Sequence, residues 1–262
     1  MCLQNLKAEI ENFLMPLIKG GVLLGFSGGT DSALLAAILA ELSRRLELTL
    51  STTATEVAKP FQLLLAIANS PLQNPTEIKA AQNLAQQFQI PYKVFELDPL
   101  SIEAVCNNHK DRCYHCKKLI FETFATHAAQ NSIAHIVDGT NADDTKIYRP
   151  GRKALEELGV VSPFAILGIT KQQIRDLSYS MKLPTWNKPA SPCLATRFPY
   201  NTPLNEQHIA MVAAAEEFLR KYFSPQANIR IRMHNENGRK KASIELDRDL
   251  LFDAQNHFGE LE

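Results

Sequence analysis

The sequence predicts an α/β protein built on a doubly wound parallel sheet, followed by a small C-terminal α+β domain. Short apolar runs at 22–26, 60–68 and 92–97 have the length and composition of buried parallel strands. Helix-forming segments such as 33–42 and 76–88 separate them. Strands that alternate with helices imply parallel βαβ units. Toward the C-terminus the order changes to one helix and two strands of alternating polarity, which predicts a separate unit.

The predicted elements follow one another along the chain. Apolar periodicity predicts a packing helix over 2–18, and residues 46–59 show no clear pattern. The main domain, assigned to residues 1–200, is expected to contain strand 22–26, helix 33–42, strand 60–68, helix 76–88 capped by Thr76, strand 92–97, helix 118–130, strand 133–137 and helix 170–181 capped by Thr170. The small domain, assigned to residues 201–262, is expected to contain helix 206–222, strands 228–233 and 242–246 joined by a turn at Asn237 and Gly238, and helix 250–258.

Composition limits the classes of partner. Of the 262 residues, 45% are hydrophobic, which is enough for a substantial core. Lysine plus arginine and aspartate plus glutamate both number 28, so the chain lacks the basic excess typical of nucleic-acid-binding proteins, and we expect no nucleic-acid partner. The apolar runs are too short to cross a bilayer, so we expect no membrane partner. Residues 1–20 show no secretory signal pattern, and we therefore expect a cytoplasmic protein.

The segment Ser27-Gly28-Gly29-Thr30-Asp31-Ser32 predicts a phosphate-binding loop. It lies between the first strand and a helix, so its two glycines allow close backbone approach and the helix start offers free N–H groups. Three hydroxyl groups add further donors. The segment lacks the lysine of the kinase and GTPase P-loop and the spacing of the dinucleotide-binding glycine motif.

Polar residues follow two other predicted strands. Asn69 and Ser70 come directly after the run over 60–68 and could line an adenosine pocket. The loop over 138–144, which contains Gly139 and Thr140, follows the strand over 133–137 and fits a nucleotide or metal role. Ligands of doubly wound sheets bind beyond the carboxyl ends of the strands, where both segments are expected. A capped turn without a ligand is equally compatible with the 138–144 loop.

Three cysteines have spacings that indicate chemistry. In the reducing compartment expected here, cysteines favour metal binding or reactivity over disulfides. Cys113 and Cys116 have the spacing of a metal or redox pair, and with Cys193 they would suit an iron–sulfur cluster with one open iron. Structural zinc, which needs four ligands, stays possible because His115 lies between the pair and His109 just upstream. Cys193, whose basic neighbours would favour a thiolate, is also a candidate nucleophile or sulfur donor, or a small buried residue. Cys2 and Cys106 have no such spacing.

These segments together carry a family resemblance. The loop over 27–32 resembles the PP-loop of the ATP pyrophosphatase superfamily, whose fold is Rossmann-like. Nearly the whole chain resembles the LarE family of ATP-dependent sacrificial sulfur transferases, through RCYHCK at 112–117, DGTNADD at 138–144, YRPG at 148–151, KPASPCLATR at 188–197 and RIR at 230–232.

The resemblance implies an activity and a substrate. The family uses ATP to adenylate a carboxylate of pyridinium-3,5-biscarboxylic acid mononucleotide, releases pyrophosphate, and lets sulfur displace AMP to give a thiocarboxylate. The product leads to the nickel-pincer cofactor of lactate racemase. In one branch the sulfur comes from the cysteine at the position of Cys193, which becomes dehydroalanine. In the other, cysteines matching Cys113, Cys116 and Cys193 hold a [4Fe-4S] cluster whose open iron carries an extra sulfide. Because this chain has all three, we favour the cluster branch, and we expect a homo-oligomer of up to six subunits.

The resemblance also assigns roles to single residues. ATP would be bound by Gly25, Phe26, Ser27, Gly28, Gly29, Thr30, Asp31, Ser32, Asn69, Gly139 and Thr140. Asp31 would bind Mg²⁺ or interact with the dipole of its helix. Arg197, Arg230 and Arg232 would hold the substrate's phosphate and carboxylates, which guanidinium groups match, and Arg230 and Arg232 share one strand face. Catalytic roles fall to Cys193, Asp31, Arg197 and Glu216, although a surface helix charge is as good an interpretation of Glu216.

Other functions stay open. A tRNA-thiolating PP-loop enzyme shares the adenylation step but should carry a basic RNA surface. An amide-forming ligase of the NAD synthetase type leaves the three cysteines unexplained. A nucleotide-binding regulatory module would have a degraded loop, whereas the loop over 27–32 is intact. Ile147, Thr196 and Ser243 stand where the family usually has aspartate, serine and arginine, so the substrate pocket is where this chain would differ.

Overall fold

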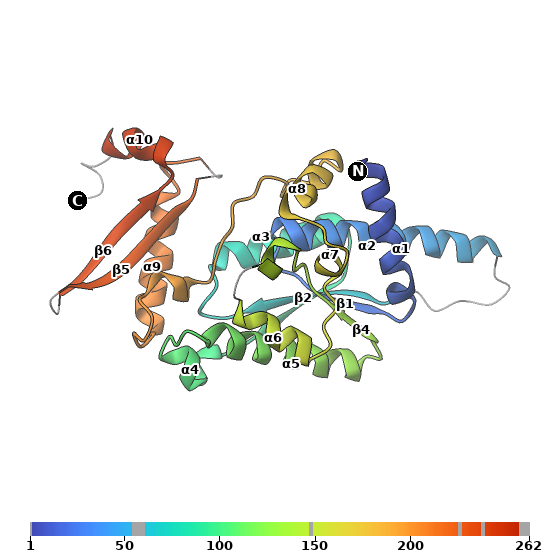
Figure 1. Cartoon of the computed structure of the whole chain (residues 1–262), viewed down its shortest axis with the longest axis horizontal. Coiled ribbons are helices and arrows are strands. Elements are labelled where there is room, and N and C mark those ends of the chain that lie inside the picture. The colour runs from blue at the N-terminus through green and yellow to red at the C-terminus, as the bar shows by residue number, and fades with distance from the viewer. Residues whose placement is uncertain (1, 54–60, 147–148, 225–226, 237–238, 257–262) are drawn as a thin grey trace.

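The computed structural model describes residues 2–53, 61–146, 149–224, 227–236 and 239–256. Its main part is a parallel sheet with helices on both faces, and a helix with a two-stranded antiparallel sheet extends from it at the C-terminal end (Figure 1). This arrangement confirms the predicted α/β class, the doubly wound sheet and the small C-terminal sheet. Within the described residues, no helix has both the length and the apolar character needed to span a bilayer.

Four parallel strands form the main sheet in the order β3-β2-β1-β4. They are β1 (Val22–Gly25), β2 (Leu63–Asn69), β3 (Tyr92–Glu96) and β4 (His135–Val137). Successive side chains alternate between the faces, since Val22 and Leu24 pack into one cluster of buried residues and Leu23 into another. Because all the strands run the same way, their carboxyl ends meet along one edge of the sheet.

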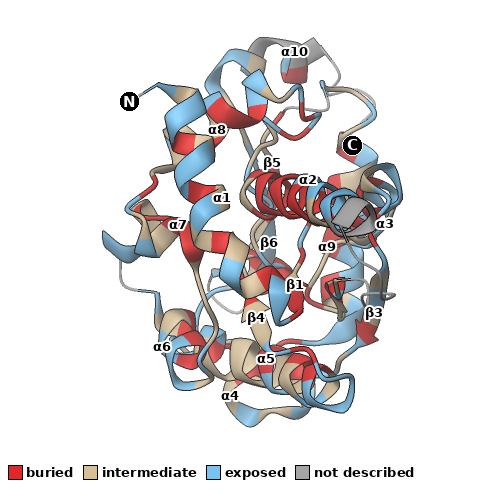
Figure 2. Ribbon diagram, turned by 90° about the vertical axis from the view of Figure 1, so that its right-hand side faces the viewer, coloured by how far each residue is buried: buried red, intermediate tan, exposed pale blue. Residues whose placement is uncertain are grey.

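Helices cover the two faces unequally. The first face carries α1 (Leu3–Lys19), α2 (Thr30–Thr53), α3 (Pro75–Phe88), α7 (Pro163–Ile166) and α8 (Lys171–Ser180). The second carries α5 (Arg112–Gln130), preceded by the short α4 (Glu103–Cys106), and α6 (Pro150–Glu157). Buried residues concentrate on α2 (Figure 2), which follows the predicted phosphate loop directly. The loop is therefore held by the buried first half of α2.

Two of the predicted helix caps have different outcomes. α3 is capped by Asn74, whose Oδ1 accepts the Thr76 N–H at 3.0 Å, so the prediction of Thr76 as the cap is wrong. The reason is Pro75, which suits the first position of a helix because its missing N–H has no partner there. Thr170 does cap α8, in a capping box with Gln173.

Some element bounds also differ from the prediction. α5 begins at Arg112 rather than at 118, which places Cys113 and Cys116 in its first turns. α2 continues through the first part of 46–59, the segment without a clear pattern. The start of the strand predicted over 60–68, the turn at Asn237 and Gly238, and the end of the helix predicted over 250–258 lie outside the described residues.

The C-terminal unit has its own small core. α9 (Glu206–Leu219) packs on β5 (Ile229–Glu236), which pairs with β6 (Arg239–Leu246) ahead of α10 (Leu251–Asn256). Val212 and Ile231 belong to the cluster that joins these elements. A second cluster, with Leu194 and Ile209, connects α9 to the segment that follows Cys193. The division of the chain at residue 200 stays a prediction.

Candidate functional site

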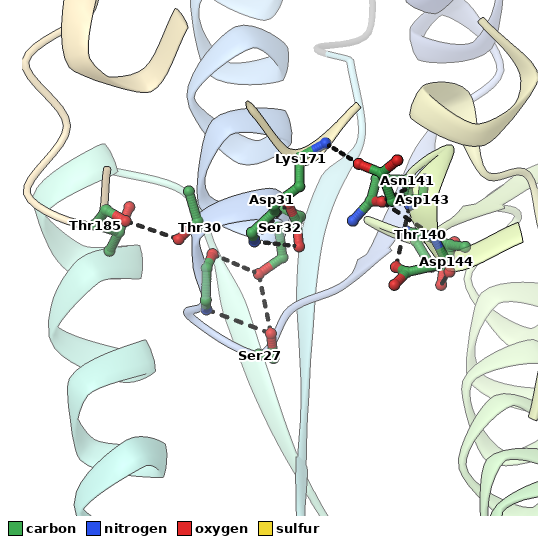
Figure 3. Close-up of polar contacts among 12 residues, drawn as sticks. Ser27, Thr30, Asp31, Ser32, Thr140, Asn141, Asp143, Asp144, Lys171 and Thr185 are labelled. Atoms are coloured by element: carbon green, nitrogen blue, oxygen red, sulfur yellow. Dashed lines mark hydrogen bonds and ion pairs between the residues drawn. The ribbon is translucent and has the colours of Figure 1, made fainter. Parts of the chain in front are cut away.

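The loop between β1 and α2 closes on itself through hydroxyl groups (Figure 3). Ser27 Oγ lies 3.2 Å from Ser32 Oγ and accepts the Gly29 N–H at 3.3 Å. Gly28 has φ +67°, and a Cβ there would lie 2.9 Å from Ala81 Cα in α3. Only glycine fits this position without strain. The loop is thus tightly wound at the carboxyl end of β1, as the sequence predicts.

The loop over 138–144 packs directly on the start of α2. A Cβ at Gly139 would lie 2.9 Å from the Ser32 nitrogen, so this glycine permits the close approach. Asp138, only 5% exposed, anchors the loop by accepting the Thr140 Oγ1–H and the Ser162 Oγ–H, each at 2.5 Å. The structure therefore brings Gly139 and Thr140 beside the phosphate loop.

Lys171 is a residue of this site that the sequence argument missed. Its Nζ lies 2.8 Å from both carboxylate oxygens of Asp31 (Figure 3), and its backbone N–H donates to Asp143 Oδ2 at 2.8 Å. Burial raises the pKa of Asp31, opposed by the charge of Lys171 and reinforced by that of Asp144. A signal was available: Lys171 is the first residue of α8, where the helix dipole disfavours a cation. A lysine in that place indicates a local anionic partner.

Asn69 and Ser70 line a cavity of about 960 Å³ beyond the ends of β2 and β3. Asn69 Nδ2 donates to both carboxylate oxygens of Glu96, at 2.8 and 3.1 Å. The opposite wall comes from α9 and includes Glu217, whose Oε2 is buried without a hydrogen-bond partner among the described residues. The volume suits a nucleotide-sized ligand.

Two hydrogen bonds fasten the segment ahead of Cys193 to the phosphate loop. Thr30 Oγ1 donates to the Thr185 carbonyl at 2.9 Å, and Lys188 Nζ donates to the Gly28 carbonyl at 3.2 Å. Lys188 Nζ also lies 2.6 Å from Glu77 Oε2 in α3. These contacts fix where the chain enters the 188–197 segment, and therefore where Cys193 can lie.

The three cysteines come together from α5 and the 188–197 segment. Cys113 and Cys193 are exposed and Cys116 is half-buried. Burial, with smaller contributions from Cys193 and Cys113, raises the pKa of Cys116 to about 12. Although Cys193 as a whole residue is exposed, desolvation of its thiol by the surrounding protein raises its pKa, assisted by the charge of Cys113 and opposed by the Ala195 N–H and two arginines. The three thiols thus lie within each other's electrostatic reach, and the expected thiolate-favouring effect of basic neighbours on Cys193 is outweighed.

Arg197 and Glu216 form a buried ion pair, 3% and 1% exposed. Arg197 Nε donates to Glu216 Oε1 at 2.6 Å and Nη2 to Oε2 at 3.1 Å, and Oε1 also accepts the Ile231 N–H at 3.0 Å. Arg197 Nη1 donates to the Pro192 carbonyl at 3.2 Å, one residue before Cys193. Glu216 is therefore not a surface charge. The pair ties the cysteine segment to α9 and β5.

Arg230 and Arg232 differ in their partners. Arg232 Nε donates to Glu245 Oε1 at 2.6 Å and Nη1 to the Thr196 carbonyl at 2.7 Å, so this side chain braces the 188–197 segment from β5. Arg230 lies on the same face of the strand, as predicted, and lines a separate cavity. Direct contact of either residue with a substrate stays a prediction.

Comparisons with known proteins agree with the site. Residues 2–136 match the family model of NAD synthase. A Lactiplantibacillus plantarum protein, pyridinium-3,5-bisthiocarboxylic acid mononucleotide synthase, is 34% identical over 83% of this chain and 73% of its own. An uncharacterized Synechocystis protein is 33% identical over 79% of this chain and 72% of its own. An uncharacterized protein of Methanocaldococcus jannaschii is 30% identical over 94% of this chain and 82% of its own length.

Proposed function

The chain belongs to the LarE family of PP-loop sulfur transferases, and from this premise we propose that it converts carboxylates of pyridinium-3,5-biscarboxylic acid mononucleotide to thiocarboxylates. The proposal is supported above all by the fastening of the cysteine segment to the phosphate loop through Lys188 and Thr30. An acyl group activated at the loop has to reach a sulfur donor before water hydrolyses it. Cys193, the proposed donor, lies on the segment that follows these two contacts.

Adenylation is the first step of the proposed reaction. A substrate carboxylate oxygen attacks the α-phosphorus of ATP, the bond to the β-phosphate breaks, and pyrophosphate leaves. The N–H groups at the start of α2 stabilise charge on the phosphates, and Asn69 lines the cavity proposed for the adenosine. Asp31 would bind Mg²⁺ once Lys171 moves from its carboxylate to a phosphate oxygen. A lysine that exchanges partners in this way keeps the half-buried carboxylate paired until nucleotide arrives.

Sulfur transfer is the second step. A sulfur nucleophile attacks the acyl carbon of the adenylate, and AMP leaves with the C–O bonding pair. Cys113, Cys116 and Cys193 would hold a [4Fe-4S] cluster, which supplies an exchangeable sulfide when bound. Among the described residues, no three Cys, His, Asp or Glu side chains are grouped to hold one metal ion. A cubane cluster does not need three ligands on one metal ion, because each cysteine binds a different iron. Three thiols that influence one another's pKa, two of them on exposed residues, fit this arrangement.

Iron and sulfide content of anaerobically purified protein tests this assignment. We expect about one [4Fe-4S] cluster per chain, with its visible absorption, in the wild type and none in Cys193→Ala. A folded wild type that holds no iron, and that loses the elements of H₂S from Cys193 during turnover, would instead indicate sacrificial sulfur donation from the cysteine itself. We also propose that the enzyme is a cytoplasmic homo-oligomer of up to six subunits, which sedimentation velocity would test.

The remaining alternative is an amide-forming ligase, because the matching family model is that of NAD synthase. The match to that model ends at residue 136, before Cys193. It also excludes Arg197 and Arg232, which donate to backbone carbonyls of the 188–197 segment on either side of Cys193. The reaction of such a ligase requires neither three neighbouring cysteines nor two arginines that hold the segment of one of them in place. We therefore favour sulfur transfer.

A further inference from the structure

A small cavity beside the cysteine segment gathers cationic side chains. It has about 50 Å³ of free volume and lies between the 188–197 segment, the C-terminal end of α9 and the start of β5. Its lining includes Ser191, two residues before Cys193, together with Lys188, Arg197, Arg220 and Arg230. Arg220 plays no part in the site described so far.

Two of the four cations already have anionic partners. The charge of Lys188 is matched by Glu77, which also lines the cavity, at 2.6 Å, and that of Arg197 by Glu216. These pairs hold the walls of the cavity in place but contribute little net charge to it. The charge that could attract a ligand must therefore come from the other two side chains.

Among the described residues, Arg220 and Arg230 have no such partners. Neither side chain forms a hydrogen bond or an ion pair with another described residue, in a fold where most other arginines near the site are paired. Asp247 feels the charge of Arg230, but its two oxygens accept the backbone and side-chain N–H groups of Asn228, at 2.9 to 3.1 Å. The cavity thus presents two guanidinium groups without a hydrogen-bonded anionic partner among the described residues, and such a pair matches a phosphomonoester that carries nearly two negative charges at neutral pH.

We propose that Arg220 joins Arg230, which the family resemblance already assigns to the substrate, in binding the phosphomonoester of the mononucleotide, an inference that rests on the proposed function. Lys188 links the cavity wall to the phosphate loop, and Ser191 lies just ahead of Cys193. A mononucleotide held here by its phosphate can direct its pyridinium carboxylates toward the site of adenylation and the sulfur donor. Sequence reasoning passed over Arg220 because an arginine after the last turn of a helix is ordinarily explained by the helix dipole.

Steady-state kinetics of Arg220→Gln test the proposal on two substrates, the pyridinium dicarboxylate mononucleotide and its riboside, which lacks the phosphate. Loss of one charged hydrogen-bonding group should raise the KM for the mononucleotide about 10- to 100-fold. The riboside and ATP should keep their wild-type KM values. Lys221→Gln is the matched control, because Lys221 is the next residue and its Nζ lies over the Phe218 ring, 5.6 Å from the centroid. It should behave as the wild type.

Equal losses on mononucleotide and riboside, or a raised KM for ATP, would overturn the assignment, the latter by placing an ATP phosphate in the cavity. Calorimetry with nicotinic acid mononucleotide separates this inference from the proposed function. A wild type that converts no pyridinium dicarboxylate, yet binds this probe more tightly than Arg220→Gln does, refutes the function and keeps the phosphate site. Equal affinity of the two proteins, or no binding by the wild type, refutes the site.

Discussion

Replacing Glu216 by glutamine should destabilise the protein strongly, because the carboxylate is the only anion that the buried Arg197 contacts among the described residues. Glu216 accepts three hydrogen bonds, from Arg197 Nε, Arg197 Nη2 and the Ile231 N–H. Glutamine keeps one acceptor oxygen and turns an NH₂ group toward donors. The substitution therefore leaves a buried guanidinium without its counter-charge and several donors without an acceptor.

The magnitude follows from the burial of the pair. Removal of one partner from a buried ion pair costs about 3–5 kcal/mol of unfolding free energy. For a chain of this size, a loss of 3 kcal/mol corresponds to a fall in Tm of at least about 6 °C. The cysteine segment should also loosen, because Arg197 holds the Pro192 carbonyl next to Cys193.

Thermal unfolding of Glu216→Gln beside Glu217→Gln measures this effect. Glu217 is the neighbouring residue on α9, and its Oε2 is buried without a partner among the described residues, so its replacement breaks no hydrogen bond at that atom and should not lower stability. If Glu216→Gln melts with the wild type and only kcat collapses, the reasoning is refuted. Glu216 would then act on the reacting groups instead of holding the fold around Cys193.

Three further predictions concern the phosphate loop and the thiols. Gly139→Ala should lower stability by about 1–3 kcal/mol, because the new Cβ would lie 2.9 Å from the backbone of α2; an unchanged Tm would contradict the close packing. Lys171→Met should raise the KM for ATP about 10-fold or more in a pyrophosphate-release assay, since the lysine that pairs with Asp31 is proposed to move to a phosphate, and a normal KM would remove it from the site. In cluster-free protein, Cys116 has its pKa raised to about 12 and should be alkylated by iodoacetamide more slowly than the exposed Cys113 at pH 8. Its alkylation should become faster as the pH rises. Equal alkylation rates of the two cysteines, measured by tandem mass spectrometry, would contradict the burial of Cys116.

Local patterns predicted the sheet and the ATP-binding edge well, for a physical reason. Buried parallel strands are short continuous apolar runs, and their carboxyl ends necessarily meet at one edge. Asn69, Gly139 and the loop over 27–32 could therefore be placed together from the amino-acid sequence alone. The cap of α3 was mispredicted only because Pro75 allows the helix to start one residue before Thr76.

Contacts between distant segments could not be predicted in the same way. Lys171 and Asp31 are 140 residues apart, and no periodicity relates them. Arg197 was expected to contact the substrate and Glu216 to act in catalysis, but which partner satisfies a buried charge depends on how α9 packs on the 188–197 segment. The same holds for Arg220. Whether an acidic side chain of the cavity pairs with it depends on which other cations those acids contact in the folded chain.

Mass analysis of the product tests the central claim most directly. The purified enzyme is incubated with ATP, Mg²⁺, sulfide and pyridinium-3,5-biscarboxylic acid mononucleotide under anaerobic conditions, and AMP, pyrophosphate and the nucleotide product are quantified. We predict a product in which sulfur replaces a carboxylate oxygen, with one AMP and one pyrophosphate formed for each sulfur transferred. Release of AMP without a thiocarboxylate would contradict sulfur transfer, and an amide formed in its place when ammonia is supplied would identify the chain as a ligase.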